Sequence, residues 1–174
     1  MGLWDVDNAG RGGADGVYHY RPHVGSVEAM HCYPEDPSKL HTLSRDGTAR
    51  TLDLEKEAWL QSFCAPESIY DVAFTSADFA PESRLWVGRG DGVVSLIDAR
   101  ASGRKYQTSS QAQDSKVNSV QQWPGRPQLL CTAGMGKAGE IRVHDLRKFS
   151  SGGSGSNSSL PLLLAADEHT KSIN

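Results

Sequence analysis

The sequence has few cysteines, no long apolar run and no excess of basic charge, and each shortage argues against a class of protein. Only three of the 174 residues are cysteines, and they lie far apart, so a reduced, intracellular setting is favoured over a disulfide framework. No apolar run approaches the ~20 residues of a membrane span, and the start lacks the pattern of a signal peptide. The net charge is -3, so contact with DNA would need a local basic patch.

The usual signatures of metal binding and catalysis are also missing. Four histidines and one cysteine lie close in sequence, but they include no C-x-x-C pair and fall on different predicted strands, so no metal site is predicted: His19, His23, His31, Cys32 and His41. The glycine-rich stretch 88–92 leads into a predicted strand, so it has no helix N-terminus to hold a phosphate. No Ser, His and Asp set stands in a nucleophile context, and no shared loop carries the carboxylate pair of a propeller hydrolase. We expect no enzyme, no cofactor and no small-molecule substrate.

The chain does contain a repeated unit. The stretch 91–100, DGVVSLIDAR, opens with an Asp-Gly turn, continues as a β-branched apolar strand and ends in Asp-x-Arg. The stretches 46–55 (DGTARTLDLE) and 139–148 (GEIRVHDLRK) repeat this pattern, and 2–6 (GLWDV) gives its plainest form. The two Asp-Gly turns are 45 residues apart, and so are three valines predicted to occupy equivalent positions in the first strand of each unit: Val27, Val72 and Val117.

A period of this length with four short strands per unit is typical of a WD-type β-propeller blade. We therefore predict an all-β fold, a partial propeller of about three four-stranded blades and two blade fragments from a seven-bladed ring. Because a closed propeller needs about four to eight blades, the sequence is interpreted as part of a longer protein or a truncated gene model. The predicted boundaries are a blade fragment at 1–22, blades at 23–68, 69–114 and 115–168, and the start of another at 169–174.

Each predicted blade has four strands in chain order. The strands of the first are Val27–Cys32, Leu40–Ser44, Thr48–Leu54 and Ala58–Phe63; of the second, Ile69–Phe74, Leu85–Gly88, Val93–Ile97 and Lys105–Ser109; and of the third, Val117–Trp123, Leu129–Ala133, Glu140–His144 and Leu160–Ala165.

WD proteins contain a buried hydrogen-bond relay from a His before the first strand, through a Ser or Thr in the second and an Asp in the next turn, to a Trp in the third. His23, Ser44 and Asp46 fit the first three roles, with Leu52 in place of the Trp. The second unit retains its turn aspartate without the His or the Trp, and a histidine opens the last unit: Asp91 and His169. These residues are expected to be structural.

Longer phrases resemble the WD repeat-containing protein 76 family, which is related to the fungal Cmr-type DNA-binding proteins and to the damaged-DNA-binding protein 2 family. The phrases are GVYHYRPHVGSVEAMHCYPEDPSKLHTLSRDGTAR (16–50), VGRGDGVVSLIDAR (87–100) and EHTKSI (168–173). The resemblance covers nearly the whole chain, with departures at Arg45, Thr51, Leu52 and Gly90 and a longer Ser/Gly loop at 150–159. It implies a nuclear, non-enzymatic chromatin protein of the DNA-damage response.

The resemblance also implies a partner, because many propellers of this class are substrate receptors of the cullin-4 ubiquitin ligase and use a box that ends in Asp-x-Arg. Two places match this ending and are candidates for binding the ligase adaptor: Asp98 with Arg100, and Asp145 with Arg147. An exposed Arg offers a planar fork for carboxylates and carbonyls of a partner. In both boxes another residue stands in place of the expected Trp, Ile97 in the first and His144 in the second. The alternative to adaptor binding is that each Arg is solvated and caps a strand.

DNA contact has its own candidates. Arg45, Arg89 and Lys137 fall in the turns between second and third strands of successive blades, and equivalent turns lie on one face of a propeller. His23 is expected nearby. Clustered positive charge of this kind is what phosphate contact requires, and the alternative is that these are solvated turn residues. The competing function is a generic WD-repeat scaffold that binds other proteins through its propeller faces without a nucleic-acid role.

Overall fold

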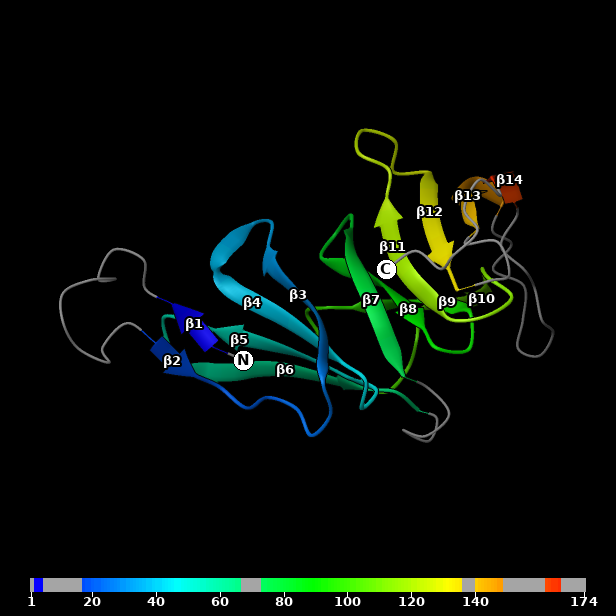
Figure 1. Cartoon of the computed structure of the whole chain (residues 1–174). Coiled ribbons are helices and arrows are strands. Elements are labelled where there is room, and N and C mark those ends of the chain that lie inside the picture. The colour runs from blue at the N-terminus through cyan, green and yellow to red at the C-terminus, as the bar shows by residue number, and fades with distance from the viewer. Residues whose placement is uncertain (1, 5–16, 67–72, 136–139, 149–161, 167–174) are drawn as a thin grey trace.

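The computed structural model describes residues 2–4, 17–66, 73–135, 140–148 and 162–166 of the chain, and almost all of their regular structure is antiparallel β-sheet (Figure 1). Three four-stranded sheets follow one another along the molecule, and a two-stranded sheet precedes them. The only helical element in this part of the chain is one short 3-10 turn, η1 (Leu146–Lys148). No helix among the described residues is long and apolar enough to cross a membrane.

Each four-stranded sheet is built from strands that are consecutive in sequence, as a propeller blade requires. The first blade contains β3 (Val27–Tyr33), β4 (Asp36–Ser44), β5 (Thr48–Asp53) and β6 (Ala58–Cys64). The second contains β7 (Phe74–Ala80), β8 (Arg84–Arg89), β9 (Val93–Asp98) and β10 (Thr108–Gln111). The third contains β11 (Val117–Gln122), β12 (Leu129–Gly134), β13 (Ile141–Asp145) and β14 (Leu162–Ala166). The preceding pair is β1 (Gly2–Trp4) with β2 (Val17–His19).

Apolar side chains from neighbouring blades form the core, because each sheet can cover its apolar faces only against the next sheet. One cluster joins the first and second blades and includes Leu43, Phe63, Phe74 and Ile97. A second cluster joins the second and third blades, and its largest side chain is Trp86, which is 5% exposed. The first strands of successive blades, β3, β7 and β11, lie next to one another.

The first strand of the second blade begins later than the sequence pattern indicated. The predicted strand Ile69–Phe74 is wrong in its bounds: β7 starts at Phe74, and residues 67–72 lie outside the described part of the chain. Val27 pairs with Ser44, Phe74 with Arg89 and Val117 with Gly134. Phe74, and not Val72, therefore occupies the position equivalent to the other two valines.

The polar residues of β7 explain why the sequence pattern did not predict the bounds of this strand. The segment reads FTSADFA, in which three of the seven residues are polar and none is Val, Ile or Leu. Its polar groups are satisfied by the neighbouring β11, since the Thr75 hydroxyl donates to the carbonyl of Val117 and Asp78 Oδ2 accepts the backbone N–H of Gln122 at 2.7 Å. The first strand of one blade can thus use polar side chains to bind the backbone of the first strand of the next blade. The fourth strand of this blade is likewise shifted, to Thr108–Gln111.

Asp-Gly turns join the second and third strands of the first and second blades. Gly47 and Gly92 have φ values of 75° and 85°, in the left-handed region that glycine adopts without strain. Gly92 also has no room for a side chain, because an added Cβ would collide with the carbonyl oxygen of Gln113. These two glycines are therefore required by the turn itself.

Candidate functional site

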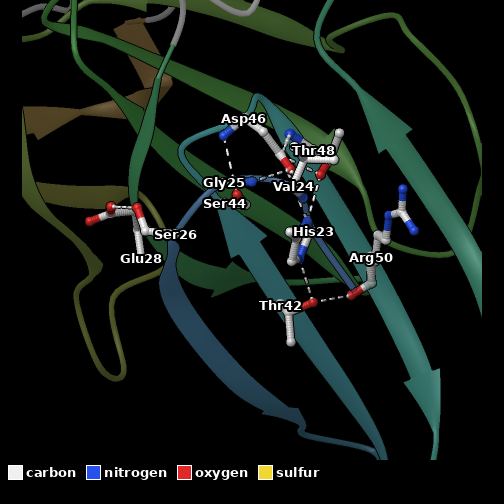
Figure 2. A network of polar contacts seen from close by, with 10 residues as sticks. All are labelled: His23, Val24, Gly25, Ser26, Glu28, Thr42, Ser44, Asp46, Thr48 and Arg50. Carbon is white, nitrogen blue, oxygen red and sulfur yellow. Dashed lines mark hydrogen bonds and ion pairs between the residues drawn. The ribbon is translucent and has the colours of Figure 1, made fainter. Parts of the chain in front are cut away.

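His23 and Asp46 lie together in a polar network at one end of the first blade (Figure 2). The side chain of His23 is 1% exposed, and its Nδ1 lies 3.7 Å from Asp46 Oδ1. Asp46 Oδ2 accepts the backbone N–H groups of Val24 at 2.9 Å and Gly25 at 3.2 Å. The network thereby ties the loop before β3 to the turn after β4.

The hydroxyl partners of His23 differ from the one that the sequence suggested. Its Nδ1 lies 2.6 Å from Thr48 Oγ1, and its Nε2 lies 2.8 Å from Thr42 Oγ1. Ser44 does not contact the imidazole in this network, because its Oγ accepts the backbone N–H of Asp46 at 3.1 Å. Thr42 Oγ1 donates to the backbone oxygen of Arg50 at 3.4 Å. The network therefore reaches β5 two residues before Leu52, the residue that stands in place of the Trp.

Burial and hydrogen bonding together shift the pKa values of the two ionisable groups in this network, His23 and Asp46. Burial, partly opposed by the attraction of Asp46, lowers the pKa of His23. Burial raises the pKa of Asp46, but hydrogen bonds from Thr48, Gly25 and Val24 outweigh it and hold that pKa below its usual value. The Asp46 carboxylate and the His23 imidazole are therefore both engaged in contacts within the first blade.

The third blade contains a matching buried contact that sequence reasoning missed. Gln113 Nε2 donates to Thr132 Oγ1 at 2.9 Å. Thr132 holds the same place in β12 as Thr42 in β4, since Val120 pairs with Thr132 and Met30 with Thr42. Each pair is separated by 19 residues in the sequence. A search for a polar residue 19 positions before a strand Thr would have found both.

The four candidates for DNA contact are placed in very different environments. Arg45 is 57% exposed, with Nε 3.5 Å from Glu28 Oε1. Arg89 is only 7% exposed: its guanidinium donates two hydrogen bonds to Asp91, at 3.2 and 2.6 Å, and lies 5.3 Å from the centroid of the Tyr106 ring. Lys137 lies outside the described residues.

Two of these four candidates have buried side chains. Arg89 and His23 are buried between packed elements and cannot reach a phosphate without leaving their partners. The burial of Arg89 follows from the register, since Arg89 ends β8 opposite Phe74, which belongs to the core cluster shared by the first and second blades. Asp91 contacts Arg89 and the backbone N–H of Val93, whereas His169 lies outside the described residues.

The two Asp-x-Arg sequences adopt one geometry at equivalent ends of the second and third blades. Arg100 donates its backbone N–H and its Nε to Asp98 Oδ1 at 2.9 and 3.1 Å, and a terminal nitrogen to Oδ2 at 3.2 Å. Arg147 contacts Asp145 in the same way, at 3.0, 2.9 and 2.6 Å. The hydrogen bond from Arg100 is the main cause that lowers the pKa of Asp98. The Arg100 guanidinium thus stabilises the ionised form of Asp98.

In both motifs the arginine is more exposed than the aspartate that holds it. The side chains of Arg100 and Arg147 are 59% and 71% exposed, against 26% for Asp98 and 4% for Asp145. A guanidinium has five N–H donors, and the aspartate occupies only some of them. Each arginine therefore presents its remaining donors to solvent in a fixed direction, at the end of the blade opposite the Asp-Gly turns.

Among the described residues, no group of three or more His, Cys, Asp or Glu side chains could hold a metal ion. The four-strand repeat, the Asp-Gly turns and the strand-end aspartates are those of WD-type β-propeller blades. No protein-family model matches the chain.

Comparison with curated proteins gives a more particular relationship. The chain is 31% identical to WD repeat-containing protein 76 of the bat Rhinolophus ferrumequinum over 99% of its length, and 30% identical to the mouse protein of that name over 99%. It is also 31% identical to DNA damage-binding protein cmr1 of Aspergillus clavatus over 75% of its length. The resemblance to the WD repeat-containing protein 76 family and the predicted partial WD-type propeller are both confirmed. The chain spans about a quarter of the length of these relatives (24–25%).

Proposed function

We propose that this protein is a non-enzymatic nuclear WD-repeat protein of the DNA-damage response, which binds DNA or chromatin and serves as a substrate receptor of a cullin-4 ubiquitin ligase. The names of its fungal relatives, DNA damage-binding protein, support the link to damaged DNA. The resemblance to the WD repeat-containing protein 76 family supports the nuclear and ligase roles. Because the chain spans only part of these relatives, the proposal and its tests concern the intact protein.

The repeated Asp-x-Arg geometry is the observation that carries the ligase role. Arg100 and Arg147 stand at equivalent ends of adjacent blades, and each is held by an aspartate two residues earlier. Holding an arginine in advance reduces the conformational entropy that is lost on binding, and its planar fork suits carboxylates and carbonyls. Two such arginines in register form a surface that a protein partner can contact at two points.

The test is co-purification of the ligase adaptor with the intact protein. Replacing Arg100 and Arg147 together with Ala is expected to abolish co-purification and to leave the melting temperature within a degree or two. The matched control replaces two other exposed arginines, Arg104 and Arg126, which have no aspartate two residues before them. Adaptor that still co-purifies with the Arg100→Ala, Arg147→Ala variant would remove this role from both residues.

DNA binding is assigned to the face of the Asp-Gly turns, with Arg45 as its exposed charge. Each phosphate contact on duplex DNA contributes about 0.9 to the slope of log K against log salt concentration. Arg45→Ala is therefore expected to lower that slope by about one without changing sequence preference, and Arg104→Ala, as a control, to leave it unchanged. Equal slopes for wild type and Arg45→Ala would mean that DNA binds elsewhere on the protein. Lys137 remains a predicted contact on the same face.

One observation favours the alternative of a protein-interaction scaffold without DNA binding. The burial of Arg89 and His23 removes two of the four charges that were expected on the turn face, and Glu28 lies close to a third, Arg45. A face with so little free positive charge attracts DNA weakly. If the intact protein shows no measurable DNA binding even at low salt, the scaffold function is the better description.

A further inference from the structure

A pocket of about 450 Å³ opens between the second and third blades, beside Arg147. Its residues come from the ends of β7 and β11, from β8, β9 and β10, from the turn before β12 and from η1. The pocket therefore opens at the end of the blades that carries the Asp-x-Arg motifs. Its volume falls in the range of about 300–1,000 Å³ that is usual for ligand pockets.

The inner wall of the pocket is apolar and has its polar groups satisfied. Trp86 and Leu96 are 5% and 7% exposed, and Leu146 packs against the same cluster. The indole Nε1 of Trp86 donates to Gln122 Oε1 at 3.0 Å, across the two blades, and the Gln122 amide donates to the Pro127 carbonyl. No donor of the indole is left for a ligand, so an apolar group suits this wall best.

Two arginines stand among the pocket residues, Arg84 and Arg147. The guanidinium of Arg147 is oriented by the buried Asp145 and is 71% exposed. Arg84 Nε donates to the carbonyl of Pro81 at 2.9 Å, and its Nη2 lies 3.5 Å from a carboxylate oxygen of Glu82, whose side chain is 74% exposed. An exposed ion pair of that length contributes little free energy, so a ligand carboxylate can replace it.

We propose that this pocket binds a short acidic segment of a partner protein, which inserts one large apolar side chain between the blades and pairs its neighbouring carboxylates with Arg147 and Arg84. The apolar side chain replaces water against Trp86, Leu96 and Leu146, and the two guanidinium groups fix the direction of the segment by charge complementarity. The inference goes beyond the proposed function and does not depend on it, because any partner with this sequence character fits the site.

The direct test uses a fluorescein-labelled synthetic peptide in which a leucine is followed by two aspartates, with glycine and serine on both sides. We expect saturable binding to the intact protein, measured by fluorescence anisotropy. Burial of a leucine contributes about 1.5–3 kcal/mol, so replacing it with glycine should weaken binding about 10-fold to 100-fold. Replacing both aspartates with asparagines should weaken it about 10-fold, and more at low salt than at high salt.

Protein variants locate the binding site. Thr108 lines the pocket from β10, so Thr108→Trp should fill the pocket and abolish binding, whereas Thr108→Val should preserve it. Arg147→Glu should weaken binding at least 10-fold, whereas Arg104→Glu, an exposed arginine outside the pocket, should not. Circular dichroism checks that each variant is folded, and the peptide series on the wild-type protein tests the proposal if Thr108→Trp fails to fold.

Three results would overturn the inference. They are the absence of saturable binding, equal binding of the leucine and glycine peptides, and unchanged binding by a folded Thr108→Trp variant. A fourth result would also contradict it: the protein forms a dimer that Thr108→Trp dissociates and that added peptide does not. The pocket would then be the contact with a second copy of the chain. The adaptor proposal can fail separately, because Arg100 does not line this pocket.

Discussion

Asp78 in β7 accepts the backbone N–H of Gln122 in β11 at 2.7 Å, so a side chain of one blade binds the backbone of the next. Its other oxygen accepts the backbone N–H of Phe79 at 2.9 Å. Asp78→Ala leaves both N–H groups without this acceptor, and the free energy of unfolding should fall by about 1–3 kcal/mol. Asp114→Ala is the control, because the Asp114 side chain is 81% exposed and its ion pair with Arg142 should contribute about 0–1 kcal/mol. Equal losses in urea unfolding would show that Asp78 does not hold the blades together.

Gly92 and Gly90 make a matched pair for a second prediction. Gly92 has a φ of 85° and faces the carbonyl of Gln113, so Gly92→Ala should lower the free energy of unfolding by about 1–3 kcal/mol. Gly90 lies two residues away, and its added Cβ would meet only ordinary contacts at 3.6 Å with Ala73. Gly90→Ala should therefore change the midpoint of urea unfolding little. A similar shift for both variants would contradict the strain assigned to Gly92.

Much of the fold could be predicted from the sequence, because the Asp-Gly turns repeat after 45 residues and the aspartates that end the third strands after 45 and 47. Asp46 and Asp91 mark equivalent turns, and Asp53, Asp98 and Asp145 end equivalent strands in the structure. The position of β7 could not be predicted, because Thr75 and Asp78 act on the neighbouring blade. Contacts between blades leave no periodic signal within one blade.

The candidate site could be predicted only in part, for a related reason. The Asp-x-Arg contacts are local, within two residues, so their partners follow from the sequence alone. The environment of Arg89 depends on Tyr106, which reaches it from the long connection between β9 and β10. The choice of Thr42 over Ser44 depends on which strand residues point toward His23 (Figure 2), and a motif pattern does not give that direction.

His41 predicts how stability depends on pH. It is 4% exposed, its ring packs against Tyr33 and Phe79, and Thr51 Oγ1 lies 2.7 Å from its Nδ1. Burial, with smaller contributions from His31 and Lys39, lowers its pKa from 6.5 to about 4.

Between these two pKa values the unfolded chain binds more protons than the folded one, so stability should fall as the pH drops from about 6.5 to about 4. A difference of this size corresponds to roughly 3 kcal/mol at most. Melting temperatures of the intact protein across this range provide the measurement. His41→Asn should flatten the dependence, while His31→Asn should retain most of it. An unchanged slope in His41→Asn would assign the dependence to other groups.

Arg89 supplies a prediction that separates a structural arginine from one that binds DNA. Its guanidinium is paired with Asp91 and lies over Tyr106, in the contact between the first and second blades. Arg89→Ala removes this packing as well as the ion pair, so the free energy of unfolding should fall by about 1–3 kcal/mol. The salt slope of DNA binding, measured well below the melting temperature, should stay at its wild-type value, because a buried arginine releases no counterions. Arg45→Ala should give the opposite pair of results, a lower slope and an unchanged melting temperature. A lower slope in Arg89→Ala, with no loss of stability, would show that this side chain leaves Asp91 and contacts phosphate when DNA is bound.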